Sequence, residues 1–415
     1  MKYPRSVAVR VLTRVLSDSE NLDDAIAHIS GELSSSELAW LQEVCSGTLR
    51  WKGRLDFILD SVASRKKPSG WLRKILLLAV YQIVVQDRIS VGAVVSETVD
   101  EIKKREGVAP SRFANACLRR IASQGKEWRE LEFPTPQQPL SPQAIAWSGL
   151  PDWIWGRLVR AYGLEWAKAY AMASFQRPEL WIRSRDLNWE ASWVAAGPIP
   201  GSWLAQEGGL VTAKKGFAEG EFFVQDITSQ TLVYEVSEEL KKYFAHGHLI
   251  SGLDLCAAPG GKAIGMAWNG IEMTATDISS LRLSVLKQSV ERTKAPVRVL
   301  PWEELDALPQ VDFVWVDAPC TGSGILRRHP DVRWLKGERE LKSLLVEQKQ
   351  ALQKGWERLK SGGFLLYSVC SVLQEEGMEQ IQASGLQFQM LRQWLFAPHL
   401  GSGGDGFTAI LVRKI

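Results

Sequence analysis

Two cysteines stand directly after apolar runs that read as buried strands. Residues 313–320 read Phe-Val-Trp-Val-Asp-Ala-Pro-Cys, which puts Asp317 and Cys320 at the end of the first run. Residues 364–372 read Phe-Leu-Leu-Tyr-Ser-Val-Cys-Ser-Val and put Cys370 at the end of the second. A thiolate is a strong nucleophile, but the thiol pKa, about 8.5 when free, must be lowered or its proton removed in place. Either cysteine alone is more often a small buried residue.

A glycine turn at residues 253–262 predicts a ligand site where a strand meets a helix. The segment reads Leu-Asp-Leu-Cys-Ala-Ala-Pro-Gly-Gly-Lys and follows an apolar run at 249–253. Gly260 and Gly261 allow a ligand to approach bare backbone, and the next helix offers unpaired N–H groups to an electron-rich ligand. The dinucleotide pattern G-x-G-x-x-G is missing, and a purely structural turn is an equally good interpretation of this segment alone.

The elements that must position these residues alternate between strand and helix over residues 226–415. Such alternation predicts an α/β domain with a mainly parallel sheet, which binds ligands at the carboxyl ends of its strands. Asp277 ends the second strand, where a carboxylate can accept hydrogen bonds from a ribose diol or cap a helix. Strands are expected near 249–253, 273–277, 297–300, 313–317 and 364–367, with a terminal pair near 386–391 and 407–413.

Composition limits the function classes. The 415 residues suggest two or three domains, and 45% hydrophobic residues suit a globular protein with real cores. No apolar run approaches roughly 18 residues, and none follows the amino terminus, so we expect neither a membrane span nor a signal peptide. Five dispersed cysteines favour a reducing cytoplasm, and no Cys/His cluster suggests a metal site. The net charge of +3 permits a nucleic-acid partner, but any basic surface must be local.

Residues 1–130 show helical spacing throughout and predict a bundle, with a largely apolar helix at 71–85 in its centre. Basic clusters could contact phosphates, although a solvated helix face is the better interpretation of any single one. These clusters are Arg50, Lys52 and Arg54; Arg65, Lys66 and Lys67; and Arg119 and Arg120.

Four prolines predict a linker over residues 131–142, followed by a small α+β module at 143–225. Within the module, a helix is expected over 153–173 and a strand over 180–185. Eight of the 18 tryptophans fall in this middle region. Tryptophans can stack on unpaired bases, but we expect most of these in core or interdomain packing.

Together, the glycine turn and the two cysteine motifs closely resemble the S-adenosylmethionine-dependent RNA 5-methylcytosine methyltransferases. The Pro-Cys and Cys-Ser pairs in this order are specific to that superfamily. Nearly the whole chain is similar to the RsmB family, also called Sun or Fmu, whose substrate is bacterial 16S ribosomal RNA. The resemblance implies a NusB-like helical RNA-binding domain at 1–130, a linker at 131–142, a ferredoxin-like RNA-binding subdomain at 143–225 and a Rossmann-like methyltransferase domain at 226–415.

The same resemblance implies a role for each matching residue. Cys370 would attack carbon 6 of cytosine and Cys320 would assist product release, whereas in DNA enzymes the Pro-Cys cysteine attacks. Asp317 would hold the base edge, lie near the methyl donor, or both, and Lys262 would bring a positive charge to these groups. Contacts to S-adenosylmethionine are expected from Asp254, Cys256, Ala257, Ala258, Pro259, Gly260, Gly261, Lys262, Asp277 and Asp317.

RNA contacts are expected from Arg183, in an Arg-containing strand, and from Arg327, Arg328 and His329, in a run similar to that of RsmB. A surface ion-pair network is the alternative for the later run. Trp302 replaces an acid that many relatives carry near the adenine, so Glu303 could substitute or the indole could stack on the adenine.

The resemblance implies methylation of carbon 5 of cytosine 967 in 16S ribosomal RNA, a base that must first be exposed. Another ribosomal or transfer RNA cytosine is one alternative. A non-catalytic RNA-binding or assembly factor that kept the fold is the other. We expect a cytoplasmic monomer without a metal ion.

Overall fold

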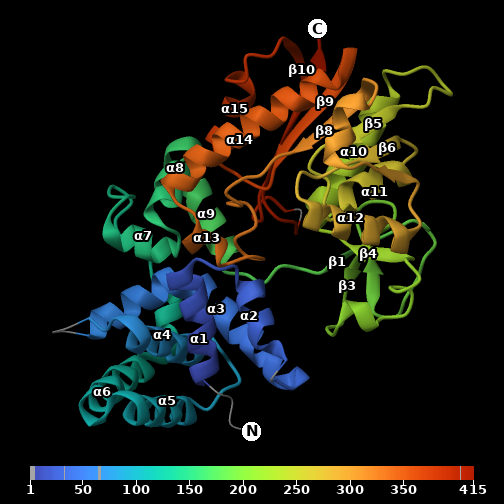
Figure 1. The fold of residues 1–415 in the computed structure, drawn as a ribbon. Helices are drawn as coiled ribbons and strands as arrows, with labels where there is room; N and C mark the ends of the chain where they lie inside the picture. The colour runs from blue at the N-terminus through green and yellow to red at the C-terminus, as the bar shows by residue number, and fades with distance from the viewer. Residues whose placement is uncertain (1–4, 32, 64–66, 402) are drawn as a thin grey trace. The chain divides into compact units, whose positions relative to one another are not determined.

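The computed structural model describes residues 5–31, 33–63, 67–401 and 403–415 (Figure 1). The chain divides into two compact units. Unit 1 comprises Met1–Gln176 and Leu326–Glu338, and unit 2 comprises Arg177–Ile325 and Arg339–Ile415. A short segment from the carboxyl-terminal half is therefore part of the amino-terminal unit, which the sequence did not predict.

Unit 1 is built from helices. The central helix α4 is apolar along most of its length, is buried from Ile75 onward, and packs against α1, α3, α5 and α6, as predicted. A capping box of Ser34 and Glu37 starts the longest helix, α3. The helices are α1 (Arg5–Asp18), α2 (Leu22–Ser30), α3 (Ser35–Val62), α4 (Gly70–Val84), α5 (Val91–Glu106), α6 (Val108–Gln124), the 3₁₀ helix η1 (Gly125–Glu130), α7 (Pro142–Ser148), α8 (Asp152–Tyr162), α9 (Leu164–Ser174) and α13 (Val332–Leu335).

The predicted linker and the helices after it also belong to unit 1. Trp147 and Trp155 donate from their indole nitrogens to the carbonyls of Leu131 and Pro139, at 2.7 and 2.6 Å. These bonds anchor the proline-rich stretch, so it connects two parts of one unit. The predicted module at 143–225 is accordingly divided: α7–α9 pack with the bundle, and only its strands belong to unit 2. Gly163, with φ +84°, separates α8 from α9 where one helix was expected.

Segment 326–338 is held in unit 1 by hydrogen bonds to backbone groups. The guanidinium of Arg333 donates to the carbonyls of four residues at 2.9–3.3 Å. Asp331 accepts a bond from the amide of Leu22, the first residue of α2, at 3.0 Å. The indole of Trp334 donates to the carbonyl of Leu49 at 2.8 Å. The four carbonyls around Arg333 are those of Arg50, Gly149, Ser174 and Leu326.

Unit 2 contains a seven-stranded sheet in the order β10-β11-β9-β8-β5-β6-β7. Strands β5 to β9 run parallel to one another, β11 pairs antiparallel with β9, and β10 pairs antiparallel with β11 at the edge. All seven predicted strands are confirmed, with shifted ends. They are β5 (Ser251–Asp254), β6 (Glu272–Ala275), β7 (Val297–Val299), β8 (Val311–Asp317), β9 (Leu359–Val369), β10 (Phe388–Phe396) and β11 (Phe407–Lys414).

Each face of this sheet has its own hydrophobic core, because successive strand residues point to opposite faces. Phe313 and Trp315 of β8 pack with residues of α10–α12, whereas Val314 and Val316 pack with Leu352 of α14. Helices therefore cover both faces (Figure 1), as in a doubly wound fold. The covering helices are α10 (Ile227–Lys241), α11 (Gly261–Trp268), α12 (Ser280–Thr293), α14 (Glu338–Glu357) and α15 (Met378–Gln382); η3 (Trp302–Ala307) and η4 (Gln374–Glu376) are 3₁₀ turns.

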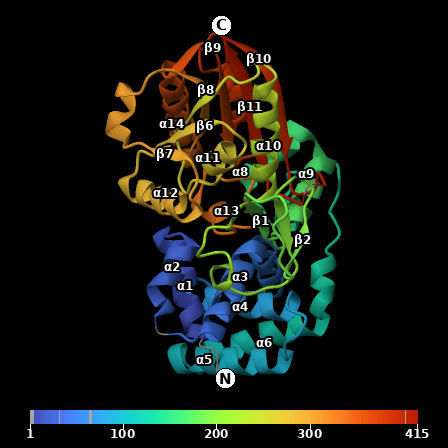
Figure 2. The same cartoon turned by 90° about the vertical axis from the view of Figure 1, so that its right-hand side faces the viewer.

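A small antiparallel sheet, visible in Figure 2 around β1 and β2, completes unit 2. Its order is β2-β3-β1-β4, and loops and the 3₁₀ turn η2 (Val211–Ala213) join its strands. Trp189 and Trp193 are buried against Phe222, so these two tryptophans serve core packing, the role expected for most. The strands are β1 (Trp181–Ser184), β2 (Val194–Ala196), β3 (Ser202–Ala205) and β4 (Phe222–Val224).

Among the described residues, no helix has the length and apolar character needed to cross a membrane. The same residues contain no cluster of three or more His, Cys, Asp or Glu side chains that could hold a metal ion.

Candidate active site

The two cysteines meet because their strands are neighbours. Asp317 at the end of β8 pairs in register with Ser368 of β9, and the amide of Ala318 donates to the carbonyl of Ser368 at 2.9 Å. This parallel register carries the following residues in the same direction. The Sγ atoms of Cys320 and Cys370 consequently lie 3.2 Å apart, although 50 positions separate them in sequence.

The glycine turn connects β5 to α11. Gly260 has φ +111°, a conformation that side chains rarely adopt. A Cβ atom on Gly260 would lie 2.8 Å from Leu286 Cδ1 of α12, so helix packing as well as ligand approach requires glycine there. A Cβ atom on Gly261 would lie 3.1 Å from the side-chain nitrogen Nε2 of Gln225. The segment before α10 thus supports the turn directly.

Two buried polar side chains at neighbouring strand ends have no partner in the described part of the chain. Asp254, which ends β5, is 1% exposed, and neither carboxylate oxygen accepts a hydrogen bond of good geometry. Burial raises the pKa of Asp254 to about 7; Asp317 adds to the increase, while Lys262 and the Cys256 amide oppose it. Thr276, just after β6, is fully buried with an unpaired hydroxyl. Unpaired buried polar atoms are costly and indicate a missing ligand or water.

Asp277, the predicted ribose acceptor, is 2% exposed and already holds the turn. Its Oδ2 accepts the amide of Ala258 at 3.3 Å, and its Oδ1 accepts the amide of Ser279 at 3.1 Å. Arg282 lies 3.4 Å from the same carboxylate and also donates to the carbonyl of Ala258 at 2.9 Å. A carboxylate has about four acceptor positions, so one position remains for a ribose hydroxyl.

Lys262 and Asp317 form a partly buried ion pair beside the cysteines. Ser368 donates to the other oxygen of Asp317 at 2.7 Å, and the indole of Trp315 donates to Ser368 at 2.8 Å. Burial would lower the pKa of Lys262, but Asp317, Asp254 and Cys370 outweigh it and raise this pKa. Lys262 therefore remains charged and interacts favourably with a Cys370 thiolate.

The thiols of Cys320 and Cys256 are held in the protonated form. The contact with Cys370, and then burial, raises the pKa of Cys320 well above its ordinary value. Burial is also the main reason that the pKa of Cys256 is raised. A protonated Cys320 can donate a hydrogen bond to the sulfur of Cys370.

Glu376 is the residue of this site that sequence reasoning missed. It is fully buried, accepts the amide of Thr321 at 2.7 Å, and accepts Gln348 Nε2 at 3.1 Å. Gln348 also donates to the carbonyl of Pro319 at 2.9 Å, and Tyr367 donates to the carbonyl of Glu376 at 2.7 Å. This network fixes the loop that carries Cys320.

Burial outweighs these bonds and raises the pKa of Glu376. Glu376 lies in the polar stretch after Cys370, and no periodic pattern of apolar residues there predicted that it would be buried.

Comparisons with known proteins decide the family. The model described as 16S rRNA methyltransferase RsmB/F matches residues 248–391, and the NusB family model matches residues 2–123. Ribosomal RNA small subunit methyltransferase B of Citrobacter koseri is 30% identical over 401 residues, which cover 91% of this chain and 89% of that protein. The protein of the same name from Yersinia pseudotuberculosis is also 30% identical, over 402 residues. The chain belongs to the RsmB/F methyltransferase family.

Solved structures agree at the level of the fold. The crystal structure of PH0851 covers all of both chains with a TM-score of 0.72 and 20% identity. NSun6 from Pyrococcus horikoshii with SFG covers 64% of this chain and 98% of that chain, with a TM-score of 0.54 and 16% identity. As an RsmB/F enzyme with a NusB domain, the protein is an RNA methyltransferase that uses S-adenosylmethionine.

The residues present fit this cofactor. Its ribose hydroxyls and α-amino group need acceptors, and Asp254, Thr276 and the remaining capacity of Asp277 supply them at adjoining strand ends. The carboxylates also suit a cationic sulfonium. Trp302, at the position expected near the adenine, begins η3 and packs against the hydrophobic cluster on the α14 face of the sheet.

The residues expected to contact RNA have different surroundings. Arg183 is 4% exposed and donates to the carbonyl of Pro200 at 2.6 Å, so it joins β1 to a neighbouring loop. Arg327 is 3% exposed within unit 1. Arg328 and His329 are half-buried, and His329 lies 4.0 Å from Asp23. Surface for an RNA contact is therefore greater at Arg328 and His329 than at the two buried arginines.

The predicted basic clusters are also mostly engaged. Arg50 and Arg54 are buried at 6% and 1% exposure. Lys52 pairs with Asp56, and Lys67 pairs with Asp60. Arg65 and Lys66 lie outside the described residues, whereas Arg119 and Arg120 are exposed on α6.

Proposed function

We propose that this enzyme methylates carbon 5 of a cytosine in 16S ribosomal RNA, at the family site cytosine 967, through a covalent bond between Cys370 and the base. The observation that carries the proposal is the 3.2 Å separation of the two sulfurs beside the Lys262–Asp317 pair. A cytoplasmic, metal-free monomer is part of the same proposal.

Each residue has a part in the covalent chemistry. The Cys370 thiolate adds its electron pair to carbon 6 of cytosine, so the carbon 5–carbon 6 bond becomes an enamine-like nucleophile at carbon 5. Bound S-adenosylmethionine supplies an electrophilic methyl group. Loss of the carbon 5 proton to a base then restores the double bond, and the carbon–sulfur bond breaks to release the thiolate. Lys262 stabilises that thiolate by its charge, and the Cys320 thiol stabilises it by hydrogen bonding.

In this proposal, Asp317 orients the base. Ser368 and Lys262 hold its two oxygens from different directions, which fixes the plane of the carboxylate. One further acceptor position on each oxygen can take the exocyclic amine of cytosine. This fixed acceptor would hold carbon 6 near Cys370.

The sharpest test separates the two thiols. Cys370→Ala should abolish methyl transfer and form no covalent adduct, because no enamine can form. Cys320→Ala should still attack but release the product slowly, so a covalent protein–RNA species should accumulate on denaturing gels with 16S RNA and S-adenosylmethionine. Cys117→Ala, which removes a buried thiol of unit 1, is the matched control and should behave like the wild type.

Three results would overturn all or part of the proposal. An adduct in Cys370→Ala but not in Cys320→Ala would exchange the roles of the thiols. Bisulfite sequencing of ribosomal RNA should show that one methylated cytosine is lost when this gene is deleted. Restoring the gene to the deletion strain should recover the methylation. Recovery at another cytosine would move the target, and recovery at none would favour a non-catalytic RNA-binding factor.

A further inference from the structure

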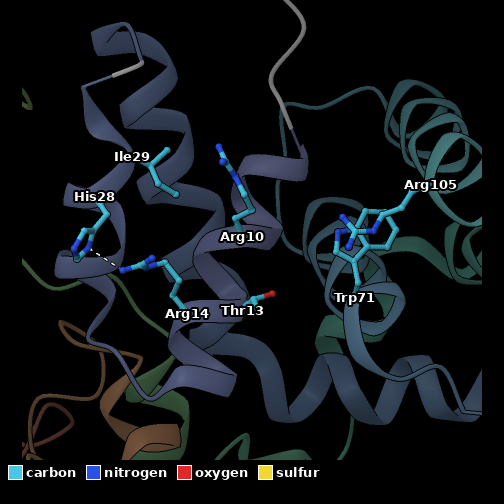
Figure 3. A pocket seen from close by; sticks show the side chains of 7 residues that line it. All are labelled: Arg10, Thr13, Arg14, His28, Ile29, Trp71 and Arg105. Carbon is cyan, nitrogen blue, oxygen red and sulfur yellow. Dashed lines mark hydrogen bonds between the residues drawn. The ribbon is translucent and has the colours of Figure 1, made fainter.

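Unit 1 contains a basic pocket whose lining residues come from four of its helices. The pocket has a volume of about 430 Å³, within the range of roughly 300–1,000 Å³ that is typical of small-ligand sites. Among the residues that the structure describes, no carboxylate lines it. Arg10, Thr13 and Arg14 come from α1, His28 and Ile29 from α2, Trp71 from α4 and Arg105 from α5 (Figure 3).

One of the three arginines is largely neutralised by neighbours. Arg14 donates to Glu20 through Nε at 2.5 Å, and its guanidinium lies 3.2 Å from His28 Nδ1. The hydrogen bond from Arg14 lowers the pKa of Glu20, and Asp18 also favours the charged form of Arg14. Arg14 is therefore a positioned part of the pocket wall whose charge is already balanced.

The other two arginines keep their charge available. Within the described residues, neither Arg10 nor Arg105 forms an ion pair with a carboxylate, and both are exposed. The Arg105 guanidinium carbon lies 4.6 Å from the centre of the Trp71 ring, and Figure 3 shows the two side chains overlapping. This cation–π contact orients Arg105 without reducing its charge. Two unbalanced guanidinium groups and an aromatic ring therefore share one pocket.

We propose that this pocket binds one nucleotide of a single-stranded RNA segment, with its phosphate between Arg10 and Arg105 and its base against the Trp71–Arg105 stack. Guanidinium groups bind phosphate through paired hydrogen bonds. Planar aromatic and guanidinium surfaces stack on unpaired bases. The inference rests on the proposed function only in taking RNA as the substrate, and it places one RNA contact on the NusB domain.

The test compares two double variants that remove equal charge. R10Q/R105Q removes the available cations of the pocket, whereas R112Q/R120Q removes two exposed arginines of α6 outside it. Binding of a short fluorescein-labelled single-stranded RNA is measured by anisotropy at several salt concentrations. R10Q/R105Q should bind about tenfold more weakly near ~0.1 M salt, and its salt slope should fall by about 0.7, since the pocket would hold one phosphate and each phosphate contact on a single strand contributes roughly 0.7. R112Q/R120Q should stay within about twofold of the wild type.

Each outcome bears on the proposal. Equal weakening of both double variants would indicate general charge attraction and overturn the pocket, as would unchanged binding by R10Q/R105Q. Stronger competition by inorganic phosphate than by unlabelled RNA would make the pocket a phosphate site and overturn the RNA assignment. Circular dichroism and S-adenosylmethionine calorimetry confirm that R10Q/R105Q is folded. The anisotropy measurement of RNA affinity does not depend on methyl transfer. A protein that binds RNA in this pocket but methylates no cytosine would therefore refute the proposed function and leave the pocket proposal standing.

Discussion

Arg333 of unit 1 and Asp254 of unit 2 are both almost completely buried, but their polar atoms have opposite surroundings. Four backbone carbonyls surround the guanidinium of Arg333, and only its Nε has no acceptor in the described residues. Within the same described residues, neither oxygen of Asp254 accepts a hydrogen bond of good geometry. Burial lowers the pKa of Arg333 to about 9 and raises that of Asp254 to about 7. The comparison teaches that a satisfied buried charge builds structure, whereas an unsatisfied one indicates a ligand.

The largest effect is expected at Arg333. Arg333→Met should lower the free energy of unfolding by about 4–5 kcal/mol, because it leaves several buried carbonyls without donors. S-adenosylmethionine affinity of the folded fraction should not change, since Arg333 belongs to unit 1. Urea unfolding measures the stability, and the exposed Arg339→Met is the control, expected to change it by less than about 0.5 kcal/mol. An equally mild effect at Arg333 would show that its bonds contribute little.

Asp254 should make stability fall as pH rises. Its folded pKa of about 7 exceeds its ordinary value of 3.8, so the folded state binds more protons than the unfolded state between these values. The free energy of unfolding should therefore decrease by up to about 4 kcal/mol from pH 4 to pH 7 through this group. Asp254→Asn should remove that decrease and also weaken cofactor binding, which urea unfolding at several pH values and calorimetry can measure.

Asp312 is the matched control because its carboxylate is satisfied. It accepts Ser251 Oγ at 2.7 Å and Lys360 Nζ at 2.8 Å. Burial opposes these bonds, but they lower the pKa of Asp312 to about 2. Its contribution to stability is therefore present above pH 4 and is lost as pH falls toward 2, the opposite sign to Asp254. If Asp312→Asn and Asp254→Asn change the pH dependence in the same direction, the distinction between satisfied and unsatisfied carboxyls is wrong.

Glu376 sharpens the comparison because it is satisfied and lies beside the reacting groups. Glu376→Ala should cost about 2 kcal/mol of stability and lower kcat roughly tenfold, since the Thr321 amide loses its acceptor and the Cys320 loop is released. Glu376→Gln keeps an oxygen for Thr321 and Gln348 and should retain most of kcat. Neither variant should change S-adenosylmethionine affinity by calorimetry. A loss of stability in Glu376→Ala with unchanged kcat would make this network purely structural.

The sequence predicted most of unit 2 because strand-end chemistry is local. Asp317, Cys320 and Cys370 follow recognisable apolar runs, and parallel neighbouring strands bring such ends together. The position of the glycine turn was predicted correctly. Position 260 also requires glycine because Leu286 packs so closely against it, and residues 253–262 alone could not predict that contact.

Contacts between distant segments could not be predicted in this way. The run 327–334 looked like an exposed basic surface, yet Arg333 is buried because carbonyls from α3, the turn after α7 and α9 converge on it. The pocket of Arg10, Trp71 and Arg105 was not predicted from the sequence at all. Its residues are too far apart in sequence to form a visible cluster, and only the packing of the bundle brings them together.

The placement of segment 326–338 in unit 1 has a consequence for synthesis on the ribosome. Helix α9 ends at Ser174, but the Arg333 side chain that joins it to α3 is added 159 residues later. At ~5–20 residues per second, the amino-terminal unit must wait on the order of ten seconds or more for its last piece. During that interval, the site for Trp334 and Leu335 on the bundle is an uncovered apolar surface. The amino-terminal unit is therefore synthesised first but completed late, and chaperones would have to protect its apolar surface in the meantime.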